Sequence, residues 1–214
     1  MSRQNNALPQ MVEPLWSTYI HQKGARLGLP VTGTFELTPR CNFNCNMCYV
    51  HQGGRRELTT AEWLAIAEEA RKAGMVFLLL TGGEPLLRPD FPELLHALKN
   101  MGFLVSVNSN GSLLRGELLE AVKRDPPLRF NITLYGGSNA AYERLCGRAM
   151  FREVVDNLRA LKDAGIPVRL NVSVTPDNKD DVPEIFRLAR ELGLHTKAST
   201  YMYPPVRLGD GRPG

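Results

Sequence analysis

The sequence lacks a long hydrophobic run. Its longest, residues 75–80, is far shorter than the roughly 20 residues that cross a bilayer. The first residues also lack the charged-then-apolar pattern of a secretory signal. Lys and Arg number 26 against 22 Asp and Glu, and no basic stripe stands out on any segment. We therefore expect a cytoplasmic protein with neither a membrane nor a nucleic acid as a partner.

Cysteine is scarce, with four in 214 residues, which is too few for a disulfide framework in a chain of this size. Three of the four nevertheless stand within eight residues, as Cys41, Cys45 and Cys48 in a C-x3-C-x2-C pattern. Three thiolates cannot all pair with one another, and a soft metal centre is their natural common partner. Three protein ligands also leave one position open for a substrate or cofactor. The pattern predicts a [4Fe-4S] cluster with one open iron.

A structural zinc site is the alternative interpretation of the same stretch. His51 follows Cys48 at C-x2-H spacing, so the three cysteines and His51 could form a Cys3His set. A chain with that site would be a zinc- or cluster-binding module without radical chemistry.

Short apolar segments alternate with amphipathic ones along the chain, as in an α/β protein with a parallel sheet. The predicted strands are rich in β-branched and aromatic residues, as strands covered by helices should be. They lie at residues 33–37, 75–80, 103–108, 128–134, 168–174 and 195–201.

Several helices have readable ends. Thr59, Asp90 and Asp181 each stand three residues before a glutamate, a capping-box pattern that predicts a helix start. Glycines at positions 74, 102 and 193 predict the corresponding helix ends. Further helices are predicted at residues 14–25, 113–124 and 151–164.

The polar residues concentrate directly after the predicted strands, at residues 38–41, 81–84, 109–111, 135–137, 175–178 and 201–204. A β/α barrel builds its functional site at this end of its strands. Six β/α units rather than eight predict a partial (β/α)6 TIM-type barrel with outer helices. We expect a lead-in over residues 1–30, a core domain over residues 31–206 and a tail over residues 207–214 that marks a truncation after strand six.

A second motif, Thr81-Gly82-Gly83-Glu84-Pro85, follows the second predicted strand. With the three-cysteine loop after the first strand, it resembles the radical S-adenosylmethionine (radical SAM) superfamily over residues 31–205. The branch it resembles most is that of the peptide maturases with a C-terminal auxiliary-cluster (SPASM) domain, and we expect the present sequence to lack that domain. The partial-barrel curvature is part of what this resemblance implies.

The resemblance also implies which residues bind S-adenosylmethionine (SAM). The diglycine segment would hold the amino group of the methionine moiety, with the Glu84 carboxylate as an acceptor for the ammonium. The residue after the third strand and one residue each on strands four and five would complete the pocket. The implied cofactor-binding residues are Gly82, Gly83, Glu84, Pro85, Asn110, Thr133 and Asn171.

The segment at residues 142–147 departs from the family pattern. Cys146 stands where many relatives carry an arginine that pairs with the methionine carboxylate, which leaves Arg144 or Arg148 as substitutes. We expect Cys146 to be a small buried hydrophobic residue rather than a cluster ligand.

The activity implied by the resemblance is reductive cleavage of SAM to a 5′-deoxyadenosyl radical, which abstracts hydrogen from a substrate. No catalytic acid or base is expected beyond the cluster. The electron would come from an external flavodoxin- or ferredoxin-like reductant. The substrate is a peptide or a small molecule, and residues 131–178 favour a peptide.

Overall fold

A computed structural model describes residues 15–50 and 56–201. The expectations for residues 1–14, for His51 and for the tail therefore lie outside the described residues. Six parallel strands form one sheet in the order β1-β2-β3-β4-β5-β6, as predicted. The strands are β1 (Thr32–Glu36), β2 (Phe77–Thr81), β3 (Leu104–Ser109), β4 (Arg129–Thr133), β5 (Val168–Ser173) and β6 (His195–Ser199).

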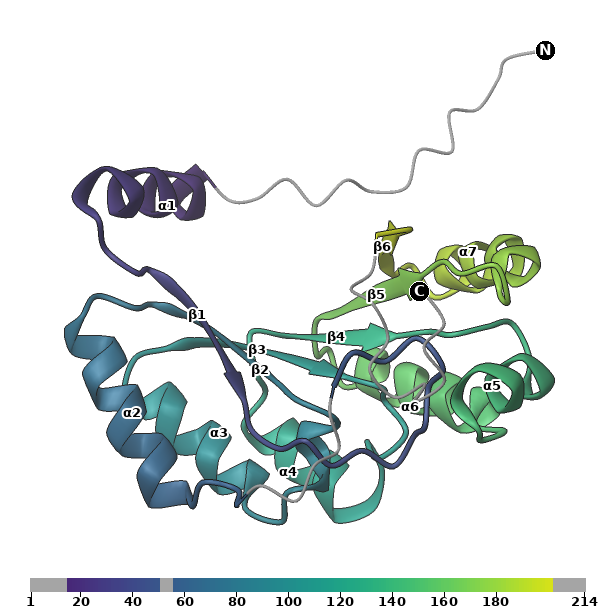
Figure 1. Ribbon diagram of the computed structural model, residues 1–214, viewed down its shortest axis with the longest axis horizontal. Coiled ribbons are helices and arrows are strands. Elements are labelled where there is room, and N and C mark those ends of the chain that lie inside the picture. Colours follow the sequence, from purple (N-terminus) through teal and green to yellow (C-terminus); the bar gives the residue numbers. More distant parts are fainter. Residues whose placement is uncertain (1–14, 51–55, 202–214) are drawn as a thin grey trace.

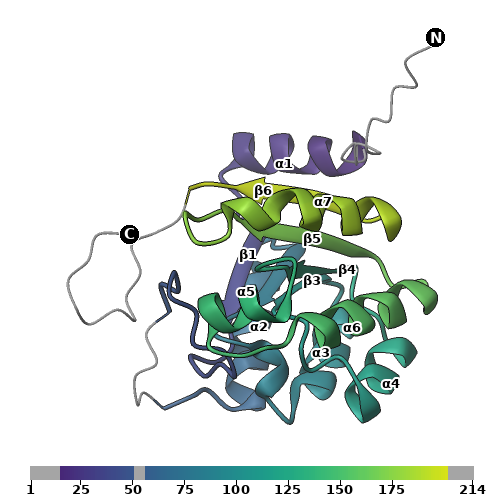
Figure 2. The same ribbon diagram turned by 90° about the vertical axis from the view of Figure 1, so that its right-hand side faces the viewer.

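The helices cover one side of this curved sheet (Figures 1 and 2). The sheet is open, so the α/β partial barrel predicted from the sequence is confirmed. The connecting helices are α2 (Thr60–Lys72), α3 (Phe91–Asn100), α4 (Gly116–Arg124), α5 (Asn139–Cys146), α6 (Phe151–Asp163) and α7 (Val182–Glu191). Two short 3-10 turns, η1 (Pro85–Leu87) and η2 (Lys179–Asp181), precede α3 and α7.

The core lies between the sheet and its helices. On the central strands, alternate residues such as Leu80, Val107, Ile132 and Leu170 are fully or almost fully buried against the helices. Removing a side chain of that size from water stabilises the fold by about 1.5–3 kcal/mol. The intervening residues point to the other side of the sheet, which is the side that builds the site.

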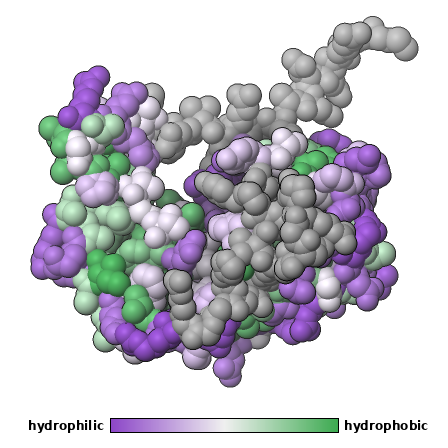
Figure 3. All heavy atoms as spheres, viewed as in Figure 1, coloured by the Kyte–Doolittle hydropathy of each residue, from purple (hydrophilic) through white to green (hydrophobic). Residues whose placement is uncertain are grey.

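The lead-in forms helix α1 (Leu15–Leu27), which stands apart from the other helices near the start of β1 (Figure 1). Trp16 and His21 stack on Phe77, the first residue of β2, and His21 Nε2 lies 3.0 Å from the Thr32 hydroxyl. Exposed hydrophobic side chains include Tyr19, and Figure 3 shows hydrophobic residues gathered over α1 and α2. Across the described ranges, no helix has the length and apolarity to cross a membrane.

Of the three predicted capping boxes, only that of α2 is confirmed. The Thr59 hydroxyl accepts from the Glu62 N–H, and the Glu62 carboxylate accepts from the Thr59 N–H. The capping predictions for Asp90 and Asp181 are wrong, because other groups engage both carboxylates. Asp90 accepts from the Arg88 guanidinium, and Asp181 accepts from the Gly137 N–H.

Two helix predictions also need correction. Helix α4 begins at Gly116, three residues later than predicted. Helix α5 was not predicted at all, although Ser138 caps its start by accepting from the Ala141 N–H. At its end, Gly147 has the left-handed φ of 69° that suits a glycine C-cap. At eight residues, this helix gave too short a pattern to recognise.

Candidate functional site

A cavity of about 1100 Å³ lies over the inner face of the sheet and the carboxyl ends of the strands. Its lining includes Cys41, Cys45, Cys48, Gly82, Gly83, Asn110, Thr133 and Asn171. The structure thus brings together all three predicted cluster ligands and five of the seven predicted cofactor-binding residues. The two that do not line it are Glu84 and Pro85, both buried.

The cysteine loop is fixed by three asparagines that alternate with inward residues. Asn42 donates to the Ser112 hydroxyl at 2.8 Å, while the backbone N–H groups of Asn44 and Asn46 donate to the last carbonyls of α5 at 3.0 and 2.9 Å. Between them, Phe43 is buried and packs edge-on against Tyr135 and Tyr142. The missed helix α5 is therefore the platform on which the cluster loop rests.

All three cysteines of this loop line the same cavity. Cys41 Sγ accepts from the Phe43 N–H at 3.4 Å. In the ranges that the structure describes, no three His, Cys, Asp or Glu side chains are arranged to hold a single metal ion. In a cube of four irons, however, each thiolate binds a different iron, so sulfurs that share a cube need not converge on one point. The donor set and its placement fit a cluster.

Gly82 and Gly83 are required by the backbone that lies against them. A Cβ atom on Gly82 would stand 2.4 Å from the Thr38 carbonyl oxygen, and one on Gly83 would stand 2.3 Å from that of Arg40. Gly82 also has a φ of 141°, which side-chain-bearing residues rarely adopt. The Gly83 N–H donates to Thr38 O at 2.7 Å, and the Glu84 N–H donates to Arg40 O at 2.8 Å. The diglycine thus joins the loop after β2 to the start of the cysteine loop and still borders the cavity.

The Glu84 carboxylate faces away from the cavity and is fully buried. It accepts from the Ser109 hydroxyl at 2.9 Å, from the Asn110 N–H at 2.7 Å and from the Leu86 N–H at 3.2 Å. Burial raises the pKa of Glu84 to about 7, and these three hydrogen bonds oppose that rise. In this structure Glu84 holds the loops after β2 and β3 together.

Asn110 reaches from the loop after β3 to the cysteine loop. Its amide group donates to Asn42 Oδ1 at 2.8 Å and lies 3.9 Å from Cys41 Sγ. Its oxygen accepts from the N–H and the hydroxyl of Ser112. Asn110 therefore borders the cavity and positions the loop that carries the predicted cluster ligands.

Thr133 and Asn171 are register partners on β4 and β5, and both line the cavity. Asn171 Oδ1 is buried without a hydrogen-bond partner. A buried acceptor left unpaired is costly, so this oxygen is available to a ligand. Both placements agree with a role in cofactor binding, which remains a prediction.

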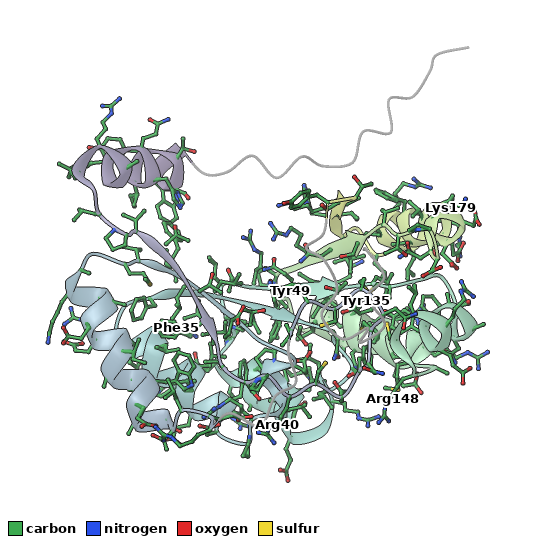
Figure 4. All side chains as sticks on the ribbon, viewed as in Figure 1. Phe35, Arg40, Tyr49, Tyr135, Arg148 and Lys179 are labelled. Atoms are coloured by element: carbon green, nitrogen blue, oxygen red, sulfur yellow. The ribbon has the colours of Figure 1, made fainter. Side chains whose placement is uncertain are left out.

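Cys146 is fully buried, as expected from the sequence. Its hydrogen bond with Cys45, followed by burial, raises the pKa of the Cys146 thiol well above its ordinary value. Arg144 is turned toward the loop after β5, where it donates to Asp177 O at 3.1 Å and pairs with Asp181 at 3.5 Å. Figure 4 shows Arg148 at the outer edge of the molecule, away from Tyr49 and Tyr135. Neither arginine lines the cavity.

Sequence reasoning missed several residues of the inner face. Arg129, Arg169 and Lys197 line the cavity from β4, β5 and β6. The sequence signal was the alternation of polar and apolar residues in β4 and β5, where each arginine precedes a buried apolar residue. Asn178 was also missed. It is fully buried, and its amide donates to Tyr135 O and Ser173 O at 2.9 Å, fixing the loops after β4 and β5.

Two curated relatives are similar in sequence to this chain. A probable GTP 3′,8-cyclase of Saccharolobus solfataricus is 33% identical over 189 residues, covering 86% of this chain and 61% of that protein. The PqqA peptide cyclase of Gluconobacter oxydans is 34% identical over 169 residues, covering 77% of this chain and 47% of that protein. The chain thus spans less than two thirds of either relative.

Solved structures share the fold. Streptococcus suis SuiB bound to its precursor peptide SuiA superposes with a TM-score of 0.72 at 16% identity, covering 92% of this chain and 47% of that chain. SuiB bound to S-adenosylmethionine gives a TM-score of 0.68 at 16% identity, covering 91% and 46%.

Residues 35–204 match the Radical SAM superfamily as a sequence family, and this range includes the cysteine loop and the diglycine motif. The match gives no support to the zinc alternative, and the assignment of the three cysteines as the cluster ligands stays a prediction. The chain belongs to the radical SAM superfamily, whose members bind a [4Fe-4S] cluster and S-adenosylmethionine.

Proposed function

We propose that this chain is the catalytic core of a radical SAM enzyme, with Cys41, Cys45 and Cys48 as cluster ligands. The observation that carries this proposal is that the three thiols and the diglycine notch border one cavity at the carboxyl ends of the strands. When bound, the cluster and SAM supply a one-electron cleavage that yields methionine and a 5′-deoxyadenosyl radical able to take hydrogen from carbon.

The protein's own residues bind, orient and shield the reactants. Gly82 and Gly83 let the methionine end of SAM approach the backbone, and Thr133 and Asn171 take its nucleoside from the inner face. Asn110 and Glu84 act indirectly, since they hold the cysteine loop and the diglycine loop in register. Pro85 begins the 3-10 turn that closes the motif. We propose that a cytosolic flavodoxin- or ferredoxin-like protein delivers the electron.

A peptide is the first candidate substrate. It is supported by the sequence similarity to PqqA peptide cyclase and by the fold shared with SuiB, which is known with its precursor peptide bound. A nucleotide is the second candidate, favoured by the similarity to a probable GTP 3′,8-cyclase over 86% of this chain. Both candidates require hydrogen abstraction from a carbon held over the cavity.

Product analysis tests the proposed reaction. Anaerobically reconstituted protein, supplied with dithionite and SAM, should release 5′-deoxyadenosine and methionine. Cys45→Ala should release neither, because it removes a cluster ligand. Glu69→Gln, which changes an exposed side chain on α2, is the control and should keep activity. If the wild-type protein binds the cluster and SAM yet releases no 5′-deoxyadenosine, the chain is not a competent radical SAM core.

A further inference from the structure

The cavity carries positive charge that no described residue of its walls neutralises. Arg129, Arg169 and Lys197 line it from three adjacent strands, and no Asp or Glu is among its described lining residues. No ion pair of Arg129, Arg169 or Lys197 occurs in the described part of the chain.

Several polar atoms on the same face are buried and unpaired. They include the Nε atoms of Arg129 and Arg169, together with His195 Nδ1. The Oδ1 atoms of Asn131 and Asn171 are unpaired as well. Buried polar groups in native proteins are nearly always hydrogen-bonded, so a group of them on one wall indicates a polar ligand.

Arg88 of the same protein shows what a structural buried arginine looks like. It is 6% exposed, and its guanidinium binds Asp90 through two hydrogen bonds and also donates to the carbonyls of Leu37 and Leu58. Among the residues that the structure describes, Arg169 has neither a carboxylate nor a carbonyl partner. Burial and the neighbouring charge of Arg129 lower the pKa of Arg169 instead. The two inner arginines repel each other across the wall of the cavity.

The register separates these arginines from the predicted SAM contacts. Arg169 precedes Asn171 by two residues on β5, and Arg129 precedes Thr133 by four on β4. At about 3.3 Å per residue, they lie roughly 7 and 13 Å deeper toward the amino ends of the strands. Arg169 is the register partner of Asn131, which follows Arg129 by two residues, so Arg129 and Arg169 form a compact group below the cofactor positions. Lys197 is the register partner of Asn171 and lies at the level of those positions.

From this group we infer that the floor of the cavity is an oxyanion subsite, in which Arg129 and Arg169 bind a phosphate or carboxylate group of the substrate. Water could satisfy the N–H groups, but only an anion also offsets the two facing charges. Guanidinium groups suit phosphate and carboxylate oxygens because their planar donors match both geometries. The statement that this ligand is the substrate rests on the proposed function. The prediction that the subsite binds an anion does not.

Calorimetry on the full chain without cluster tests the subsite directly. The anionic probes are tripolyphosphate and a glutamate-rich peptide, and the neutral probe is the glutamine counterpart of that peptide. We expect at least one anionic probe to bind, and Arg129→Gln and Arg169→Gln each to weaken it by about tenfold or more. Arg159→Gln, which changes an exposed arginine on α6, should bind as wild type does. Binding of tripolyphosphate alone identifies a phosphate-bearing substrate, and binding of the peptide alone identifies an acidic peptide.

The inference is overturned if neither anionic probe binds wild-type protein, or if the inner variants weaken binding no more than Arg159→Gln does. SAM binding to reconstituted protein should be unchanged in Arg169→Gln, which separates failure of the subsite from failure of the proposed function.

A thermal measurement distinguishes ligand binding from a structural role. Arg169→Met keeps the aliphatic stem and removes the repulsion with Arg129, so the melting temperature of the ligand-free protein should stay the same or rise. Arg88→Met should lower it, because it breaks the buried ion pair with Asp90 and removes the donors to the Leu37 and Leu58 carbonyls. If Arg169→Met lowers the melting temperature as much as Arg88→Met does, Arg169 is structural and the subsite is refuted.

Discussion

The two faces of the sheet differ sharply although the same strands build both. On the helix side, Leu80, Val107, Ile132 and Leu170 are fully buried in an apolar core. On the cavity side, β2 contributes apolar residues such as Leu79, but most residues of β4 and β5 are polar, and several carry buried atoms without partners. Ile132 and Thr133 are neighbours in the chain, yet one belongs to the core and the other to the cavity.

This difference indicates that the helix side determines stability and the cavity side determines function. Proteins leave polar groups unsatisfied mainly where a ligand will satisfy them, and such positions contribute little to folding. Substitutions on the two faces should therefore have separable effects.

The largest expected effect on stability is on the helix side. Ile132→Ala removes a fully buried side chain and should lower the free energy of unfolding by about 2–5 kcal/mol. Thr133→Ala should change it little, because the Thr133 hydroxyl makes no hydrogen bond within residues 15–50 and 56–201, yet it should weaken SAM binding. Denaturant unfolding and SAM titration of both variants measure the contrast. Equal stability losses at the two positions would abolish the distinction between the faces.

The next largest expected effect is the pH dependence of stability that Glu84 causes. This residue is buried in the loop after β2. Burial raises its pKa from 4.5 to about 7, so the folded state holds the proton more tightly than the unfolded chain does. The contribution of Glu84 to the free energy of unfolding should be fully present below about pH 4.5 and should be lost, by up to about 3 kcal/mol, as the pH rises through 7.

Unfolding curves at several pH values check this prediction, with Glu84→Gln as the comparison. The amide cannot titrate, so the slope between pH 4.5 and 7 should flatten in the variant. An unchanged slope would show that another group titrates in this range.

The smallest effect is expected at the α2 cap, far from the cavity. Thr59→Ala removes one half of the capping box and should cost about 1 kcal/mol of stability with no effect on SAM binding. Glu69→Gln, on the exposed side of the same helix, is the control and should leave the melting temperature unchanged. A loss of SAM affinity in Thr59→Ala would link the outer layer to the site.

Much of this fold was predictable from the sequence, because the apolar segments that form strands and the glycines that end helices are local signals. All six predicted strands exist in the predicted order. The errors arose where tertiary partners compete with local preferences. Asp90 and Asp181 have the pattern of helix caps, but Arg88 and Gly137 engage their carboxylates from outside the helix. Such competition is invisible to a local pattern.

Site residues that belong to a sequence motif could be predicted, whereas site residues that tertiary packing positions could not. The cysteine pattern and the diglycine pointed to one cavity that the structure contains. The burial of Glu84 could not be read from its motif, since it depends on hydrogen bonds from Ser109 and Asn110 on another loop. The inner arginines form no basic stripe in the sequence, because they lie on different strands and only the strand register brings them together.

The most direct test of the account is electron paramagnetic resonance of the reduced, anaerobically reconstituted protein with and without SAM. The account predicts the signal of a single [4Fe-4S]+ cluster that changes when SAM is added, and no such signal in Cys45→Ala. A wild-type protein that binds zinc instead of iron, or a cluster signal that SAM leaves unchanged, would contradict it.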